Sequence, residues 1–401
     1  MEDKPLIQEI ALENFLSFGE EQRIALEPLN VLIGPNGSGK SNFLEAFALL
    51  HAAPVDLPKP IRESGGAIEW LWKGGEEPRP AKVAAVVSYE HAQRLQYSVS
   101  FRAEAGRFVL EDETVERPRP PSIGGEAYFR YGYQQGDAAV VYPTMFKEVD
   151  GERMPAPQLL KLGGLKGDQS VLAQRKDPEQ YPEFAHLVQI LSGIELYRGF
   201  DLDAYGVLKN PQKVDSIKIP LLESGSNLAL VFNDLDNRGA EHRLVAELQR
   251  FCPTIERITQ SIEGRTVQVL VHEKGFRDPI PASRLSDGIL RYLCLLAILC
   301  HPEPPPLVCI DEPEQGMHPD AIHRIGELLI EASQRTQLVV TTHSDRLVSA
   351  LRDVPESVVV CERGEEGTRL ERLEPDRLQQ WLEEYTLGEL WMQGHLGGTR
   401  W

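Results

Sequence analysis

The spacing of apolar residues in the first part of the chain predicts strands, one long helix and a meander. Residues 6–18 (LIQEIALENFLSF) and 21–34 (EQRIALEPLNVLIG) have the pattern of two strands separated by a turn. Residues 41–53 (SNFLEAFALLHAA) repeat their apolar positions at helical spacing. Apolar and polar residues alternate through residues 81–112, which predicts antiparallel strands. Residues 113–170 are rich in Pro and Gly and show no regular period.

The rest of the chain has a largely helical pattern over residues 182–251, followed by strands and helices in turn. These later elements are a strand at 265–275, an apolar helix at 289–300, a short buried strand at 307–310 (LVCI), a helix from about residue 320, and strands at 337–343 (QLVVTTH) and 357–363 (SVVVCER). The sequence contains no internal repeat and no sustained heptads, so it does not predict a long coiled coil.

Composition and charge restrict the class of protein. The chain has 401 residues, with 42 Lys and Arg against 61 Asp and Glu, which gives a formal charge of −19. A protein this acidic is not a general nucleic-acid wrapper, although a local basic patch is compatible with the total. The apolar run Ile289–Cys300 is interrupted by Arg291 and is too short for a bilayer, and the charged N-terminus does not resemble a signal peptide. Five scattered cysteines favour reduced thiols, so we expect a cytoplasmic protein without membrane association.

The stretch GPNGSGKS, Gly34 to Ser41, matches the phosphate-binding pattern G-x-x-x-x-G-K-[ST]. A β-branched strand precedes it and a helix follows it, which is the context that this pattern requires. Its glycines allow backbone N–H groups to surround phosphates, Lys40 can reach the β- and γ-phosphates, and the Ser41 hydroxyl can bind Mg²⁺. We therefore predict ATP and Mg²⁺ as ligands. The predicted nucleotide-binding residues are Gly34, Pro35, Asn36, Gly37, Ser38, Gly39, Lys40, Ser41 and Asn42.

An acidic pair, Asp311 and Glu312, ends the apolar strand in LVCIDEPEQGMHPD. Asp311 can hold Mg²⁺ through a water, and Glu312 can orient and deprotonate the attacking water that phosphoryl transfer to water requires. Acidic residues often end strands for structural reasons, but together with a lysine loop they predict catalysis. His343 ends the strand QLVVTTH, at the edge where ligands bind in α/β sheets, and we predict that it contacts the γ-phosphate.

A second candidate anion site lies in SRLSDGILRY, Ser283 to Tyr292. Ser286, Asp287 and Gly288 stand at the start of an apolar helix, where free N–H groups and the helix dipole favour an anion. Unlike the first site, this stretch contains no lysine. The chain therefore carries two candidate phosphate-binding motifs, and only the first contains a lysine.

These motifs, in this order, resemble the ATP-binding-cassette superfamily, and most closely its RecF/SMC-type heads and the ATPase part of the OLD nucleases. The matching stretches are IALENFLSFGE, LNVLIGPNGSGKSNFLEAF, RLSDGILRYL, CIDEPEQGMHPD and VVTTHSDRLV. The ending LGELWMQGHLGGTRW also resembles a group of AAA-type ATPases of bacteria. The resemblance implies an α/β P-loop NTPase head with a mixed or parallel sheet core, an antiparallel β lobe and a helical or irregular insert. The expected domains are residues 1–60, 61–259 and 260–401.

The resemblance also implies how the second motif is used. In this superfamily two heads pair head-to-tail, and the signature of one head contacts the γ-phosphate held by the other. By carry-over, the signature residues Ser286, Asp287 and Gly288 would act in trans, and the loop from Gly316 to Asp320 would communicate across the interface. The family's Mg²⁺-contacting glutamine would be Gln174, with Gln169 as the alternative.

Departures from the family leave two main functions open. Ser286 lies 245 positions after Ser41, a spacing that disfavours a transporter subunit, and the 58 residues after His343 are too few for the nuclease domain of full OLD proteins. One hypothesis is a slow ATPase switch that acts on DNA in repair or anti-phage defence, together with a separate nuclease subunit. The alternative is a sensor that regulates an effector protein without binding DNA. Energising a transporter is a third, less favoured function.

Overall fold

The computed structural model describes residues 6–75, 77–89, 93–117, 129–134, 137–149, 152–161, 164–203 and 205–397. The chain divides into two compact units, each assembled from segments that are separated in the sequence. Unit 1 contains residues 1–27, 34–194 and 359–372, and unit 2 contains residues 28–33, 195–358 and 373–401. Both units contain helices and strands, so the predicted α/β class is confirmed.

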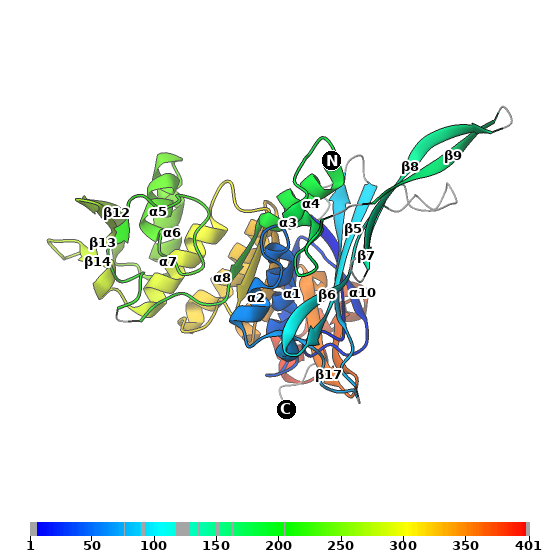
Figure 1. Cartoon of the computed structure of the whole chain (residues 1–401). Helices are drawn as coiled ribbons and strands as arrows, with labels where there is room; N and C mark the ends of the chain where they lie inside the picture. The colour runs from blue at the N-terminus through cyan, green and yellow to red at the C-terminus, as the bar shows by residue number, and fades with distance from the viewer. Residues whose placement is uncertain are drawn as a thin grey trace. The chain divides into compact units, whose positions relative to one another are not determined.

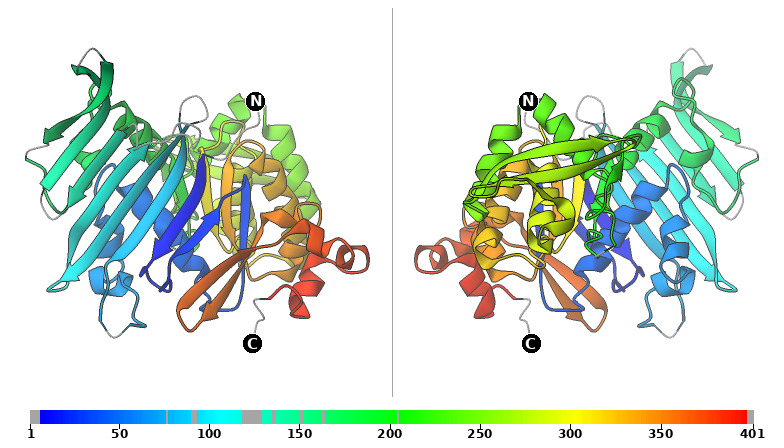
Figure 2. Two further views of the ribbon diagram at one scale, coloured as in Figure 1. Left: turned by 90° about the vertical axis from the view of Figure 1, so that its right-hand side faces the viewer. Right: turned by 90° about the vertical axis from the view of Figure 1, so that its left-hand side faces the viewer.

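An antiparallel sheet of order β2-β1-β4-β5-β6-β7-β8-β9 dominates unit 1 (Figure 1 and Figure 2). Its strands are β1 (Ile7–Glu13), β2 (Gln22–Ala25), β4 (Ala81–Tyr89), β5 (Gln93–Glu104), β6 (Arg107–Arg117), β7 (Phe129–Gln134), β8 (Asp137–Val149) and β9 (Glu152–Lys161). Val83 pairs with Val99 and Ala85 with Tyr97, and all four are buried. Because alternate residues share a face, this register places one face of β4 and β5 in the core. The meander predicted over residues 81–112 is confirmed.

Strands β7, β8 and β9 form in the segment whose sequence shows no regular period. Pro155 and Pro157 lie in β9, the last strand of the sheet order, and Pro143 lies in β8 where the register shifts between Tyr142 and Met145. Proline cannot donate a ladder hydrogen bond, so strands tolerate it at sheet edges and at bulges. The prolines therefore hide the strand pattern in the sequence without preventing the pairing.

The main helix of unit 1, α1 (Lys40–Ala52), buries its apolar residues as the sequence predicts. The ring of Phe43 lies 6.5 Å from that of Phe18 and 5.6 Å from that of Phe47. Shorter helices are α2 (Lys59–Glu63), α3 (Val171–Gln174) and α4 (Pro182–Ser192). The antiparallel hairpin of β17 (Val358–Gly364) and β18 (Gly367–Arg372) supplies the C-terminal segment of this unit.

Unit 2 contains a parallel sheet in which β16 (Gln337–Thr341) lies between β15 (Leu307–Asp311) and β3 (Leu29–Ile33). β10 (Ile194–Tyr197) lies beside β15, at the end of the strand order. Every residue of β3 and β16 is buried, which explains why these strands appear in the sequence as continuous apolar runs. The register pairs Asp311 with Thr341 and Thr341 with Leu32, so the three strands end at one edge.

Helices and a small antiparallel sheet complete unit 2. The sheet has β13 (Thr266–Glu273) between β11 (Gln212–Lys213) and β12 (Ile255–Glu263), and β14 (Ile280–Pro281) also pairs with β13. The helices are α5 (Leu228–Asn237), α6 (Glu241–Phe251), α7 (Asp287–Leu299), α8 (Pro319–Ser333), α9 (Asp345–Ser349), α10 (Pro375–Leu378) and α11 (Leu387–Met392). Within the described part of the chain, none of the helices has the length and apolar character needed to cross a membrane.

A buried carboxyl group joins the sheet of unit 1 to α3. Glu113 on β6 accepts hydrogen bonds from the Tyr97 hydroxyl (2.9 Å), the Val171 N–H (2.8 Å) and the Ser170 hydroxyl. Burial raises the pKa of Glu113 from 4.5 to about 7, although the bonds from Ser170, Val171 and Tyr97 favour the ionised form. The folded protein therefore holds the Glu113 proton to a higher pH than the unfolded chain does.

Replacing Glu113 with Gln should change the pH dependence of stability. A carboxyl group whose pKa is raised by folding lowers the free energy of unfolding as pH increases from about 4.5 to about 7. Glu113→Gln removes this loss, so the variant should gain up to about 3 kcal/mol over the wild type across that interval. Urea unfolding at several pH values measures the difference, with Glu104→Gln at an exposed site as the control. A difference that does not vary with pH would contradict the assignment.

Candidate functional site

The loop Gly34–Ser41, called the glycine loop below, follows β3 and leads into α1. Three of its glycines have positive φ: 151° at Gly34, 75° at Gly37 and 105° at Gly39. Residues with a Cβ rarely adopt these angles, so the pattern of glycines and the path of the loop agree. The first turn of α1 contains no acidic residue, and its positive dipole end is therefore suited to an anion.

Side chains and backbone of β17 and β18 hold the glycine loop in place. A Cβ on Gly34 would lie 2.3 Å from the carbonyl oxygen of Cys361. The Thr368 hydroxyl donates to the Ser38 carbonyl oxygen (2.8 Å) and lies 2.7 Å from Ser17 Oγ. Sequence reasoning missed Thr368 and Ser17, because neither belongs to the motif and the contacts form only in the folded unit.

The glycine loop fits a polyphosphate. Lys40 is 4% exposed, and its ammonium group donates to the carbonyl oxygens of Gly34 (2.9 Å) and Pro35 (3.0 Å), which places it inside the curve of the loop. Ser38 Oγ is buried and has no hydrogen-bond partner among the described residues. A buried hydroxyl without a partner costs free energy, and such a group is typical of a site that binds a ligand. Asn36, Gly37 and Ser41 are exposed, so the loop is open to solvent on one side.

The ends of β15 and β16 in unit 2 bring three predicted site residues together. The Thr341 hydroxyl donates to Asp311 Oδ1 and accepts a bond from the Glu312 N–H (3.1 Å). Glu312 has a φ of 47°, which is unfavourable for a residue with a side chain, and strain of this kind is common at functional sites. His343 Nε2 lies 3.2 Å from Glu312 Oε1. Asp311, Glu312 and His343 thus form one group, called the acidic edge below.

Glu314 supports the acidic edge, and the sequence analysis did not single it out. Its Oε1 accepts hydrogen bonds from the Thr342 hydroxyl (2.6 Å) and from the His343 N–H (2.8 Å). Burial raises the pKa of Glu314, and repulsion from Glu312 contributes to the same direction. Glu314 therefore fixes the backbone that carries His343. The only sequence signal was its place two residues after Glu312.

A magnesium ion at this site would be bound jointly by protein side chains and by a phosphate group of the nucleotide. No group of three or more His, Cys, Asp or Glu side chains in the described ranges is arranged to hold a metal. Mg²⁺ commonly binds one or two protein oxygens and completes its shell with waters and substrate phosphates. The hydroxyl of Ser41 and the carboxylate of Asp311 are ligands of that type, and the assignment of Ser41, Asp311 and Gln174 to the metal stays a prediction.

Gln174 lies at the end of α3 and bonds to its own loop. Its side-chain oxygen accepts from the Lys166 N–H (2.7 Å), and its amide donates to the carbonyl oxygens of Lys166 (3.2 Å) and Gln169 (3.0 Å). These bonds would have to open before the amide could reach a metal. The assignment of Gln174, with Gln169 as the alternative, stays a prediction.

The signature residues begin α7 in unit 2. Ser286 caps this helix by accepting a bond from the Ile289 N–H (3.3 Å), and both Ser286 and Asp287 are exposed. A Cβ on Gly288 would lie 3.3 Å from the carbonyl oxygen of Gly316, so the signature contacts the loop that follows the acidic edge. The two elements for which the resemblance implies a role in trans are therefore joined within one unit.

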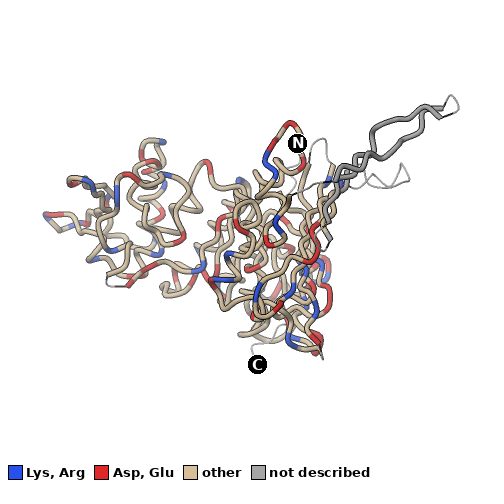
Figure 3. The backbone as a smooth tube through the Cα atoms, viewed as in Figure 1, with Lys and Arg blue, Asp and Glu red and all other residues tan. Residues whose placement is uncertain are grey.

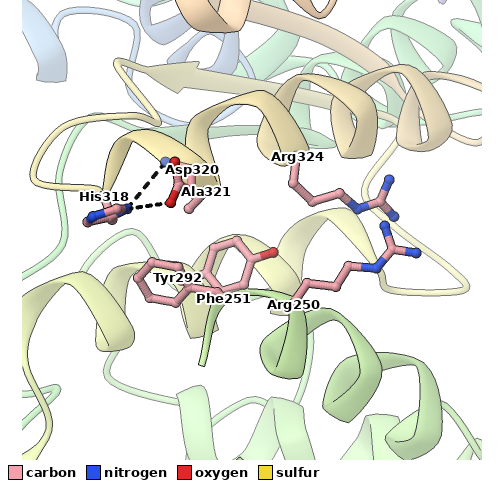
Figure 4. A pocket seen from close by; sticks show the side chains of 7 residues that line it. All are labelled: Arg250, Phe251, Tyr292, His318, Asp320, Ala321 and Arg324. Carbon is pink, nitrogen blue, oxygen red and sulfur yellow. Dashed lines mark hydrogen bonds and ion pairs between the residues drawn. The ribbon is translucent and has the colours of Figure 1, made fainter. Parts of the chain in front are cut away.

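A pocket of about 320 Å³ lies where α6, α7 and α8 meet (Figure 4). Phe251 and Tyr292 are among its lining residues, along with His318, Asp320 and Arg324. Arg324 bonds to Glu247 at 2.7 and 2.8 Å and to Glu327 at 2.6 Å, so its charge is compensated within the protein. Arg250 also lines the pocket, and its Nε lies 3.9 Å from Glu247 Oε2, so Glu247 faces both arginines.

Comparison with known proteins identifies the family. The AAA_21 family model, described as "AAA domain, putative AbiEii toxin, Type IV TA system", matches residues 29–349, which is more than half of the chain. The chain belongs to this family. It is a P-loop ATPase of the AAA kind, and the predicted enzyme class is confirmed.

Two solved Smc heads share the fold of this AAA_21 ATPase. A head bound to the C-terminal winged-helix domain of ScpA has a TM-score of 0.55 at 14% identity, over 94% of this chain and 100% of that chain. An Smc head with an extended coiled coil, bound to the C-terminal domain of ScpA derived from Pyrococcus furiosus, has a TM-score of 0.52 at 15% identity, over 95% and 99%. An ATP/GTP phosphatase of Helicobacter pylori is 18% identical over 369 residues, covering 87% of this chain and 88% of that protein.

Replacing two glycines of the glycine loop with Ala should distinguish the cost of backbone strain from the cost of a steric clash. A Cβ on Gly39 would lie 2.2 Å from Thr368 Oγ1, whereas a Cβ on Gly37 would meet no atom within 4 Å. Both residues have positive φ, so Gly37→Ala should cost about 1 kcal/mol and Gly39→Ala about 3 kcal/mol of unfolding free energy. Urea unfolding of the two variants measures the difference. Equal costs would show that Thr368 does not hold the loop.

Proposed function

We propose that this ATPase is a switch that pairs head-to-tail with a second copy of itself around ATP and separates after hydrolysis. The observation that carries the proposal is the exposed signature at the start of α7, in a chain that has a complete glycine loop elsewhere. Each copy would then supply its glycine loop to one nucleotide and its signature to the other. This arrangement has twofold symmetry and buries two nucleotides in one interface.

The glycine loop binds the phosphates in this account. Lys40 and the N–H groups at the start of α1 offset the negative charge, and the positive φ values of Gly37 and Gly39 keep Cβ atoms out of the way. The lysine exchanges its bonds to the Gly34 and Pro35 carbonyl oxygens for bonds to the triphosphate. Ser41 and Asp311 would hold Mg²⁺, which would neutralise part of the charge that develops on the phosphate.

The acidic edge activates the water. Glu312 is the general base, and the two bonds from its N–H to Thr341 O (3.2 Å) and Oγ1 (3.1 Å) fix its backbone. His343, held by Glu314 through its N–H, places its imidazole 3.2 Å from the Glu312 carboxylate and contacts the γ-phosphate. A base that is oriented in this way can accept the proton of the attacking water.

Pairing depends on the nucleotide because the nucleotide contacts both copies. A γ-phosphate bound by Lys40 on one side and by the partner's Ser286 and Gly288 on the other stabilises the dimer. Hydrolysis removes the group that favours the closed state, so the equilibrium returns to separate copies. ATP turnover and assembly are thereby coupled.

The setting is either DNA repair or anti-phage defence with a separate nuclease subunit, or regulation of an effector protein. Two similar solved heads are described as bound to ScpA domains, and a partner protein is in keeping with that. Figure 3 shows Lys and Arg interspersed with Asp and Glu in both units, and the total charge is −19. These charges support the effector hypothesis, whereas ATP-dependent and salt-sensitive binding to duplex DNA would support the other.

Three variants test the switch. Glu312→Gln should retain ATP and accumulate as a dimer, because binding is intact and the base is lost. In that background, Ser286→Arg should bind ATP normally but stay monomeric, while Lys40→Ala should lose ATP. Sedimentation velocity and equilibrium ATP binding measure both properties.

Ser283→Arg is the matched control, since Ser283 is exposed on the same loop outside the signature. If Ser286→Arg pairs as tightly as Ser283→Arg in ATP, the role of the signature in trans is wrong.

A further inference from the structure

The signature carries a carboxylate where it should approach a triphosphate, and this charge is met by a lysine from another part of the chain. Lys209 Nζ lies 2.6 Å from Asp287 Oδ1. The Lys209 side chain is 17% exposed, and that of Asp287 is 63% exposed. Lys209 therefore approaches from the protein side and leaves the outer face of Asp287 open.

The loop that carries Lys209 is built to hold it. The Asp201 carboxylate accepts a bond from the Val207 N–H (3.1 Å), and the Gly206 N–H donates to the Asp203 carbonyl oxygen (2.8 Å). The Lys209 N–H donates in turn to the Gly206 carbonyl oxygen (3.2 Å). A Cβ on Gly206 would lie 2.3 Å from Asp201 Oδ1, so the turn requires glycine at this position. These bonds hold the backbone that leads to the lysine.

Asp287 has opposite effects on α7 and on a bound triphosphate. A carboxylate in the first turn stabilises a helix through its dipole, which accounts for an acidic residue at this position. The same carboxylate repels any phosphate that Ser286 and Gly288 contact, and this repulsion is strong where water is excluded. The cation on Lys209 offsets the repulsion without removing the helix start.

Another cation on α7, Arg291, interacts electrostatically with Asp287 and packs against an aromatic ring. The guanidinium of Arg291 lies over the ring of Phe200, 5.9 Å from its centroid, and burial lowers the pKa of Arg291.

The loop with Lys209 also exposes apolar side chains: Tyr205 is 95% exposed and Val207 is 36% exposed. Exposed apolar residues beside the signature are in keeping with a face that a second copy covers.

We propose that Lys209 is a positioning residue, which neutralises Asp287 so that the signature can approach the triphosphate held by a second copy. This inference rests on the proposed function. It gives the signature the lysine that its own motif does not contain. Lys209 acts through Asp287 and does not itself contact the nucleotide.

The test compares charge variants in the Glu312→Gln background at fixed salt, with the dimer dissociation constant in ATP measured by sedimentation velocity. Lys209→Met should weaken pairing about 10-fold per site, or about 100-fold for a dimer with two sites. Adding Asp287→Asn to Lys209→Met should restore pairing to near the parent value, because the uncompensated charge is gone. Lys209→Arg should pair as the parent does. ATP binding to the monomer should be unchanged in all three, since the glycine loop is untouched.

Lys213→Met, at an exposed position on β11, is the control for loss of a lysine. Thermal unfolding of every variant shows whether α7 and the loop remain folded. If the parent pairs and Lys209→Met pairs as tightly, this inference alone is wrong. If Lys209→Met with Asp287→Asn stays as weak as Lys209→Met, Lys209 does not act through Asp287 and the inference is also wrong. If the parent does not pair in ATP, the proposed function fails and this inference fails with it.

Discussion

The parallel pairing of β16 with β15 and β3 is the constraint on which the candidate chemistry depends. Its register sets Asp311 opposite Thr341 and Thr341 opposite Leu32, so the strand ends are aligned at one edge. The chain continues from β15 into Glu312, from β16 towards His343, and from β3 into the glycine loop. A shift of one residue would turn these side chains to the other face of the sheet. Every position of β3 and β16 is buried, and the buried Asn30 amide donates to the Leu338 carbonyl oxygen (3.1 Å), a bond that such a shift would break.

Lysine side chains at fixed positions compensate local negative charge in this acidic protein. In the proposed function a chain with a charge of −19 binds a polyanion, and local cations at fixed positions would offset the repulsion. Lys40 is held inside the glycine loop by carbonyl oxygens, and Lys209 is paired with Asp287 at the start of α7. Glu314 lies close to Glu312, and burial together with repulsion from Glu312 raises the pKa of Glu314. The net charge of the chain therefore says little about the phosphate-binding sites.

The motifs were predictable from the sequence because they are local. The glycine loop, the residues after β15 and the start of α7 each lie in one short stretch with a recognisable turn, strand end or helix cap. Contacts between distant segments were not predictable, because they form only in the folded chain. Examples are the bond from Thr368 to the glycine loop, the bond from the His343 N–H to Glu314, and the ion pair of Lys209 with Asp287. Strands β8 and β9 were missed because their prolines obscure the alternation. The roles of Gln174 and Ser286 and the domain limits at residues 60 and 259 stay predictions.

The central claim is that one nucleotide is completed by two copies of the chain. The most direct measurement is the specific ATPase activity of the wild-type protein over a wide range of protein concentrations, at saturating ATP and Mg²⁺. If the catalytic unit is a dimer, activity per chain should fall on dilution, in parallel with the loss of the dimer in sedimentation. Constant activity per chain at concentrations where only the monomer is present would contradict the account.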